Sequence, residues 1–323
     1  MSFAIRVHRT GGPDVMQWES VDVPAPGPRQ VRLRHTAIGL NFLDTYFRSG
    51  LYPLPLPFTP GAEAAGVVEA VGSDVVGFSR GDRVAYAGAT GAYAEQRVID
   101  ADALVRLPDG IDDRTAAAVL LQGVTARFLI KEVRPVTDGE FILVHAAAGG
   151  VGGLLCQWAR ALGARPIGTV SSPAKAEVAA RNGCEHVIIT AEQDFVARVN
   201  EITAGRKLGV VFDSVGRDTF AGSLDCLRPR GMMVVYGQSS GVIEPLEINL
   251  LARKGSLVLT RPVMPDFVGT QAQMAEAAAD LFDAIQKGLL TVRIGQVRPL
   301  TEAADAHRDL ENRRTIGSTV FTL

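Results

Sequence analysis

The sequence has few cysteines, no excess charge of one sign and no long apolar run. Its three cysteines, Cys156, Cys184 and Cys226, are too few and too scattered for a disulfide framework or a metal knuckle, so we expect buried, inert thiols. With 33 basic and 35 acidic residues, the chain lacks the cationic field that attracts nucleic acid or anionic lipid. Its apolar runs are shorter than the roughly 20 residues of a membrane helix, and no export signal begins it. We therefore expect a cytoplasmic protein with no membrane or nucleic-acid partner.

The length of 323 residues and the 47% hydrophobic content predict a globular α/β protein with two domains. Residues 1–123 consist of short apolar stretches broken by turn residues, which predicts a β-rich domain. From 124 to 290 strands, glycine-rich turns and helices alternate, which predicts a doubly wound parallel sheet. We expect the tail, residues 291–323, to fold back onto the first domain.

Within the alternating part, apolar runs of strand length predict the sheet, and helix formers between them predict its helices. The predicted strands are residues 141–144, 167–170, 187–189, 210–212, 232–236 and 257–259. The predicted helices end at 161, 181, 203 and 227, with one more at 271–286 and a helical piece at 302–313 in the tail.

A proline-rich segment, residues 51–60, can form neither a ladder nor a helix, so we expect an extended surface loop. Two interpretations stay open: a stiff connector, or a loop whose apolar edge lines a substrate cleft.

The glycines Gly149, Gly150 and Gly152 follow a predicted strand and open a predicted helix around Val151. This context fits a variant of the dinucleotide fingerprint, in which backbone amides and the helix N-terminus bind pyrophosphate. An ordinary tight turn is the alternative. The flanking alternation of strands and helices favours the binding loop.

The cofactor type is indicated by the end of the second strand of this sheet, where NAD-binding proteins usually carry an acidic residue. Residues 169–175 contain no acid; they contain Ser171, Ser172 and Lys175. Lysine occurs only at 131, 175, 207, 254 and 287, so a lysine here favours a 2'-phosphate and hence NADPH. The alternative is a solvated lysine on the helix surface.

Five segments together resemble the zinc-free quinone oxidoreductases of the medium-chain dehydrogenase/reductase superfamily, the zeta-crystallin group. They are residues 38–46 (IGLNFLDTY), 48–53 (RSGLYP), 60–66 (PGAEAAG), 145–152 (HAAAGGVG) and 213–216 (DSVG). The resemblance implies a GroES-like catalytic domain, residues 1–123 with 291–323, and a Rossmann NADP-binding domain, 124–290. It also implies NADPH-dependent reduction of quinones and a homodimer formed through the edge strand near 257–260.

The resemblance also indicates that no metal takes part. Zinc-dependent relatives carry Gly-His-Glu where this chain has Gly61, Ala62 and Glu63, and a cysteine near Asn41. Neither ligand is present here, and no cysteine precedes Cys156. Without a Lewis acid, hydride donation to an electron-poor acceptor is favoured over alcohol oxidation.

On the substrate side, the resemblance places Asn41, Phe42, Asp44, Tyr46 and Tyr52 around the nicotinamide and the substrate. Tyr52 and Tyr46 are candidates to donate a hydrogen bond to the quinone oxygen, unless they are packing tyrosines and water supplies the proton. Asn41 would orient the nicotinamide ribose. Asp44 is a catalytic-site candidate without a proton-transfer role, or a capping acid.

On the cofactor side, the resemblance adds residues around each part of NADPH. They are Thr125, Tyr236 and Gln238 near the nicotinamide, Gly150 and Val151 at the pyrophosphate, Val215 near the adenine, and Arg313 at the 2'-phosphate. Arg314, next in sequence, could take the place of Arg313. Thr190 stands where close relatives place a tyrosine against the adenine, so the preference for NADPH could be weaker.

Two other functions stay open. An enal or enone reductase needs the same hydride and differs mainly in the shape of its pocket. A nucleotide-binding protein with a crystallin-like or RNA-binding role is the non-enzymatic alternative, although the balanced charge disfavours RNA.

Overall fold

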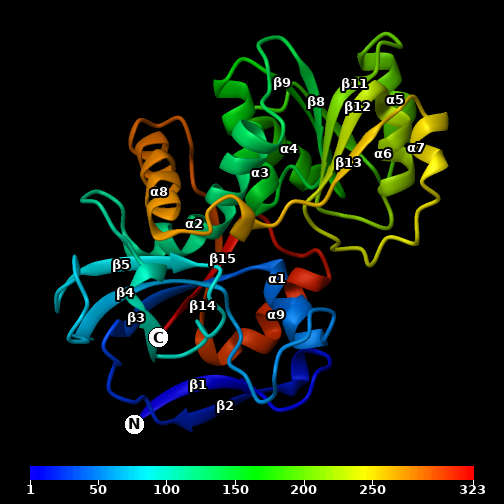
Figure 1. Ribbon diagram of the computed structural model, residues 1–323. Coiled ribbons are helices and arrows are strands. Elements are labelled where there is room, and N and C mark those ends of the chain that lie inside the picture. The colour runs from blue at the N-terminus through cyan, green and yellow to red at the C-terminus, as the bar shows by residue number, and fades with distance from the viewer. The chain divides into compact units, whose positions relative to one another are not determined.

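The structure is a computed structural model that describes residues 1–323. It divides into two compact units (Figure 1). Unit 1 comprises Met1–Val124, Val268–Lys287 and Val292–Leu323, and unit 2 comprises Thr125–Phe267 and Gly288–Thr291. Helix α2 (Asp113–Phe128) runs across the boundary between them.

Unit 1 is built on a seven-stranded sheet and a two-stranded one. The large sheet has the order β14-β15-β3-β4-β5-β7, with β6 also pairing with β3. Its strands are β3 (Gln30–Leu40), β4 (Glu63–Val71), β5 (Arg83–Ala87), β6 (Gln96–Asp100), β7 (Val105–Arg106), β14 (Ile294–Pro299) and β15 (Ser318–Thr322). β1 (Ser2–Val7) and β2 (Met16–Val21) form the small antiparallel sheet.

The C-terminal tail completes this sheet, because β15 pairs antiparallel with β3, with Phe321 opposite Ile38. Both side chains are fully buried in the core of unit 1, together with Leu33 and Tyr86. The helices wholly in unit 1 are α1 (Phe42–Ser49), α8 (Gln271–Gln286) and α9 (Ala303–Glu311).

Unit 2 is a six-stranded parallel sheet flanked by helices (Figure 1). Its order, β10-β9-β8-β11-β12-β13, is the doubly wound arrangement of dinucleotide-binding domains. The strands are β8 (Phe141–Val144), β9 (Arg165–Val170), β10 (His186–Ile189), β11 (Leu208–Asp213), β12 (Leu227–Val235) and β13 (Val258–Thr260). The helices are α3 (Gly150–Ala161), α4 (Pro173–Arg181), α5 (Phe195–Ile202), α6 (Phe220–Cys226) and α7 (Asn249–Arg253). The predicted α/β class with a β-rich domain and a doubly wound sheet is confirmed.

The predicted domain of residues 124–290 includes α8, which the structure groups with unit 1. Leu281 on α8 is fully buried, and a Cβ on Gly123 would lie only 2.4 Å from its Cδ1 atom. At the end of α8, the Gln286 amide donates to the Asp109 carbonyl at 2.7 Å. Helix propensity predicts that a helix forms here, but it carries no information about which surface covers its apolar face.

The proline-rich segment is anchored to the first strand of the chain. Phe58 exchanges backbone hydrogen bonds with Val7, and its ring is buried against Val7 and Val15. Leu51 and Leu56 in the same segment remain exposed. The aromatic ring of this loop therefore serves the packing of unit 1, which favours the connector interpretation.

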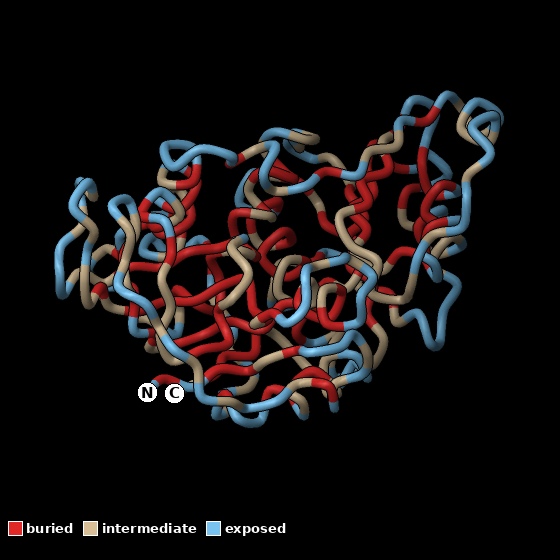
Figure 2. Tube along the Cα trace, turned by 60° about the horizontal axis from the view of Figure 1, so that its bottom comes forward, coloured by how far each residue is buried: buried red, intermediate tan, exposed pale blue.

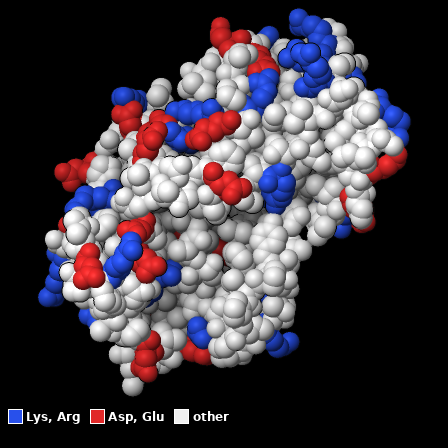
Figure 3. All heavy atoms as spheres, viewed as in Figure 1, with Lys and Arg blue, Asp and Glu red and all other residues white.

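Burial and charge follow the pattern of a globular protein. The buried segments gather in the interior of the trace and the exposed segments lie around its outside (Figure 2). Acidic and basic side chains are intermixed over much of the face drawn in Figure 3. No helix is long and apolar enough to cross a membrane.

Candidate active site

In unit 1, Asn41 is the N-cap residue of α1, directly after β3. The Asp44 carboxylate accepts the Asn41 backbone N–H at 2.9 Å, which is the reciprocal bond of a capping box. Asp44 is fully buried. Its bond to Asn41 is that of a capping acid, the alternative role that the sequence left open. Capping fixes the start of α1, and with it the direction in which the Asn41 side chain leaves the backbone.

The Asn41 side-chain amide is held by residues of two other elements. Its Nδ2 donates to Glu63 Oε2 on β4 at 2.8 Å, and its Oδ1 accepts from Gln122 Nε2 on α2 at 3.2 Å. Glu63 Oε1 accepts the backbone N–H of Leu121 at 2.7 Å. Glu63 is fully buried, and Asn41 is 6% exposed.

Burial strongly perturbs the two carboxyl groups of this cluster. It raises the pKa of Asp44 to about 7, against the effect of hydrogen bonds from Asn41 and Tyr93. It raises the pKa of Glu63 to about 8, and the nearby Asp44 charge acts in the same direction. Buried carboxyls with such pKa values are typical of functional sites, although structural networks produce them too.

A chain of buried hydrogen bonds joins Asp44 to the tail helix. Tyr93 Oη donates to Asp44 Oδ2 at 3.0 Å and also contacts His307 Nε2 on α9 at 3.0 Å. Arg48 Nη1 lies 3.1 Å from His307 Nδ1. Burial, with the Arg48 charge, lowers the pKa of His307 to about 3, so the ring is neutral and Nδ1 accepts from Arg48. The chain therefore runs in one direction, from Arg48 to the Asp44 carboxylate.

The predicted aromatic residues lie together on α1 and just beyond it. Tyr46 contacts Phe42 at a centroid distance of 5.6 Å and Tyr52 edge-on at 5.2 Å. The backbone N–H of Tyr52 donates to the Tyr46 carbonyl. The structure thus places Asn41, Phe42, Asp44 and Tyr46 along α1, and Tyr52 just beyond the C-terminal end of that helix.

In unit 2, the glycine loop joins β8 to α3 through a sharp turn. Ala146 has a positive φ of 55°, and its carbonyl accepts the Gly149 N–H at 2.9 Å. A Cβ on Gly152 would lie 2.4 Å from this carbonyl oxygen, so only glycine fits there. No side chain caps α3 at Gly149, which leaves the first-turn N–H groups, including that of Val151, without a side-chain acceptor. These donors suit the pyrophosphate of a dinucleotide.

At the end of β9, the structure places polar groups where a 2'-phosphate is expected. Ser172 is the N-cap residue of α4, but its side chain makes no capping bond. Ser171 precedes it, and Lys175 lies in the first turn of α4. Thr190, after the neighbouring β10, donates its hydroxyl to the Val170 carbonyl at 3.2 Å. Its side chain thus closes the end of β9 and does not stack as an aromatic ring would.

The ends of β11 and β12 carry the remaining predicted residues of unit 2. Asp213 Oδ1 accepts the backbone N–H groups of Val215 at 2.7 Å and Gly216 at 3.0 Å, which shapes the loop after β11. Tyr236 follows β12, and its hydroxyl is buried with the Ser214 side chain close to it, but without a hydrogen bond of good geometry. The hydroxyl therefore keeps the capacity to donate a hydrogen bond to a ligand. Gln238 lies two residues further along, with its Cα against Gly216.

Two predicted cofactor residues lie outside these loops. Thr125 is on α2, at the first position assigned to unit 2. Arg313 belongs to unit 1, follows α9, is exposed and has a positive φ of 59°. Neighbouring Arg314 lies 3.7 Å from Asp309, so Arg314 is partly engaged in an ion pair.

Sequence reasoning missed a buried polar cluster beneath the nucleotide loop. His145 contacts the Thr169 hydroxyl at 2.8 Å and the Ser223 hydroxyl at 2.9 Å, while Asp213 Oδ2 accepts from Thr219 at 2.7 Å. It also missed Glu63, Gln122 and Tyr93 in unit 1. These buried polar residues are hard to predict from the sequence, because a single polar residue inside an apolar run produces no periodic pattern.

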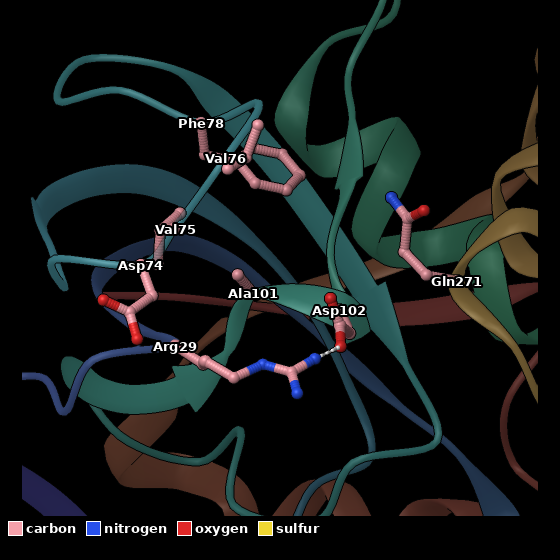
Figure 4. A pocket seen from close by; sticks show the side chains of 8 residues that line it. All are labelled: Arg29, Asp74, Val75, Val76, Phe78, Ala101, Asp102 and Gln271. Atoms are coloured by element: carbon pink, nitrogen blue, oxygen red, sulfur yellow. Dashed lines mark hydrogen bonds and ion pairs between the residues drawn. The ribbon is translucent and has the colours of Figure 1, made fainter.

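One cavity of unit 1 is separate from these residues. It has a volume of about 190 Å³ and is lined by Arg29, Asp74, Val75, Val76, Phe78, Ala101, Asp102 and Gln271 (Figure 4). Arg29 is paired with Asp102 at 2.5 Å. None of the predicted site residues lines this cavity.

Metal-binding residues do not gather in any part of the protein. No group of three or more His, Cys, Asp or Glu side chains has an arrangement that could hold a metal ion. The three cysteines are free and buried.

Comparison with known proteins identifies the relatives of the chain. The family model described as "Alcohol dehydrogenase GroES-like domain" matches residues 27–109, and the one described as "Zinc-binding dehydrogenase" matches 150–284. The quinone oxidoreductase of Pseudomonas aeruginosa is 49% identical over 99% of both chains. A 2-haloacrylate reductase from a Burkholderia species is 46% identical over 99% of both.

A solved structure of a relative superposes closely on this chain. The crystal structure of Escherichia coli quinone oxidoreductase complexed with NADPH superposes with a TM-score of 0.98 at 45% identity, covering 99% of this chain and 100% of that one. The GroES-like unit and the doubly wound unit define a medium-chain oxidoreductase. Within that class, the chain belongs to the quinone oxidoreductase family.

Proposed function

We propose that this protein is an NADPH-dependent quinone reductase that works without a metal ion. The observation that carries the proposal is the nucleotide loop of unit 2: an uncapped α3 beginning at Gly150, in a sheet of dinucleotide-binding order, with no acid at the end of β9. The relatives described above are named quinone oxidoreductase and 2-haloacrylate reductase, and the solved structure of one quinone oxidoreductase contains NADPH.

The residues of unit 2 bind the cofactor along the carboxyl ends of its strands. The amides of Gly150 and Val151 hold the pyrophosphate, with Gly149 and Gly152 allowing the close approach. Ser171, Ser172 and Lys175 hold the 2'-phosphate through hydroxyl and ammonium donors. Val215 and Thr190 lie on the adenine side, and Tyr236, Gln238 and Thr125 lie on the nicotinamide side. Arg313 adds a cation for the 2'-phosphate.

The residues of unit 1 position the substrate. Bound NADPH supplies the hydride, and Asn41 with Phe42 orients the nicotinamide ribose and ring. Tyr46 and Tyr52 are phenol donors for the quinone oxygen that gains negative charge. Asp44 holds the N-terminus of α1 in place and transfers no proton. The edge-on contact holds the two tyrosine rings 5.2 Å apart between centroids.

The second candidate is an enal or enone reductase, favoured by the 46% identity to a 2-haloacrylate reductase. The same hydride serves both reactions, so the shape of the pocket decides. The test compares initial rates of NADPH oxidation with 1,4-benzoquinone, 2-chloroacrylate and an unsaturated aldehyde. We expect kcat/KM for the quinone to exceed the others by about tenfold or more. A higher value for either alkene would assign the protein to the second candidate.

We also propose a cytoplasmic homodimer. β13 is the outer strand of the six-stranded sheet, and the exposed Val258 begins it. An unpaired edge with an apolar residue suits pairing with the same strand of a second copy. The mass in solution, measured by light scattering, decides between monomer and dimer.

A further inference from the structure

Four side chains of unit 1 form a continuous relay of hydrogen bonds through the candidate site. Glu63 on β4 accepts from Asn41, Asn41 accepts from Gln122 on α2, and Gln122 Oε1 accepts from the Ser318 hydroxyl on β15 at 2.9 Å. The four side chains come from separate elements, and all are buried. Each amide in the relay could be turned over, which would exchange its donor and its acceptor.

The two ends of the relay differ in how strictly they set the donor and acceptor roles of the amides between them. At one end, the Leu121 backbone N–H fixes Glu63 Oε1 as an acceptor, so only Oε2 faces Asn41. At the other end, the Ser318 hydroxyl lies 2.9 Å from both the Ala118 carbonyl and Gln122 Oε1, and it can donate to either. The Ser318 hydroxyl is thus compatible with either orientation of the Gln122 and Asn41 side-chain amides. The orientation is therefore determined by Glu63 at the other end of the relay.

We propose that Glu63 is a positioning residue that fixes the direction of the Asn41 side-chain amide, and thereby which polar atom Asn41 offers to the nicotinamide half of the cofactor. This inference rests on the proposed function, because it takes Asn41 as a cofactor contact. An ionised carboxylate only accepts, so Asn41 must turn its NH2 group toward Glu63 and its oxygen toward Gln122, as in the structure. Without that acceptor, the oxygen and the NH2 group exchange places.

The surroundings of Glu63 make its charge sensitive to pH near neutrality. Burial raises its pKa to about 8. From α1, the Asp44 carboxylate acts on it by repulsion, and from α2 only backbone N–H groups reach it. From β3 it faces Gly39, where a Cβ would lie 2.7 Å from Oε2, and from β5 it pairs with Ala87. Below its pKa, Oε2 carries a proton and donates, which reverses both amides.

The first arm of the test observes the amide itself in the protein without cofactor. Asparagine occurs only at 41, 182, 200, 249 and 312, so selective 15N labelling gives five side-chain signals, and Asn41→Asp assigns the relevant one. We expect the Asn41 NH2 signal of the natural protein to titrate between about pH 7 and 9. In Glu63→Gln, which cannot become a pure acceptor, the titration disappears.

The second arm measures NADPH affinity by nicotinamide fluorescence at pH 6.5 and pH 9. We expect the natural protein to bind about tenfold more tightly at pH 9, because one hydrogen bond is reversed at the lower pH. Glu63→Gln should bind weakly at both pH values. The matched control is Glu69→Gln on the same strand, whose carboxylate pairs with Arg32 and Arg34 outside the relay and which should behave as the natural protein does.

The outcomes separate the two proposals. An Asn41 signal that does not titrate, or a Glu63→Gln variant with the pH profile of the natural protein, overturns the positioning role. Titration of Asn41 with the expected NADPH profile, but no reduction of quinone, supports the positioning role and overturns the proposed substrate.

Discussion

At the scale of single residues, the proposed function makes Lys175 the residue that discriminates between the two nicotinamide cofactors. Lys175 lies in the first turn of α4, three residues after the N-cap residue Ser172, whose side chain makes no capping bond. A lysine bonded to a phosphate contributes about 1.5 to 3 kcal/mol, since the bond is charge-assisted. We therefore expect Lys175→Ala to raise KM for NADPH by about tenfold or more and to leave KM for NADH unchanged.

The matched control for this substitution is Lys287→Ala. Lys287 forms an exposed ion pair with Asp283 on α8, far along the sequence from the nucleotide loop. Steady-state kinetics with both cofactors measure the effect. Equal losses with NADPH and NADH in Lys175→Ala would show that the lysine does not contact the 2'-phosphate.

The sequence predicted some residues of the site and missed others for identifiable reasons. Gly152 was predictable, because a tight strand-to-helix turn leaves no room for a Cβ, and the structure has that contact. Glu63 and Gln122 were not predicted as partners of Asn41, because they come from elements far apart in the chain. His145 was given no role, and its two hydroxyl partners appear only once β9 and α6 pack beside it.

At the scale of elements, the tail helix α9 is joined to α1 by an ion pair whose basic partner, Arg48, is buried and whose acidic partner, Glu311, lies at the surface. Arg48 on α1 is 2% exposed and makes two hydrogen bonds to Glu311 at the end of α9, while its Nε donates to the Gly11 carbonyl. Removing the Glu311 charge would leave the buried Arg48 guanidinium without its counter-charge. The pair therefore holds the tail to the helix that carries Tyr46.

This pair gives a prediction for stability. We expect Glu311→Gln to lower the free energy of unfolding of unit 1 by about 1.5 to 3 kcal/mol, because the buried Arg48 guanidinium loses its charge-assisted hydrogen bonds to the half-exposed Glu311 carboxylate. Asp305→Asn on the same helix removes an exposed pair with Arg308 and should cost less than about 1 kcal/mol. Urea titrations followed by circular dichroism measure both. Equal destabilisation by the two variants would contradict the account.

The elements themselves were predicted unevenly. The strands of unit 2 and its helices α3 to α6 follow from the alternation of apolar runs and glycine turns, and their predicted bounds lie within a few residues of those observed. The short helix α7 was not predicted. Helix α1 was missed within the β-rich part, although Asn41 and Asp44 form a capping arrangement that could have signalled it. The packing of α8 against unit 1 was not predicted, because the residues that α8 contacts, such as Gly123 beside Leu281, are distant in sequence.

At the scale of the whole molecule, the strand order of unit 2 and the return of β15 to β3 agree with the family. Sequence patterns predict parallel strands but do not fix their order. The order follows from crossover connections that bring Asp213 beside the strand ending at Val144. This arrangement places the loops after β8, β9, β11 and β12 at one edge of the sheet, where a dinucleotide binds.

The most direct measurement of the central claim is the initial rate of NADPH oxidation, and separately of NADH oxidation, with 1,4-benzoquinone in the presence of EDTA. The account predicts a rate that the chelator does not change and that is about tenfold or more higher in kcat/KM with NADPH, because it assigns Lys175 to the 2'-phosphate and gives no metal ion a part in hydride transfer. A rate abolished by the chelator, or no oxidation of either cofactor, would contradict it.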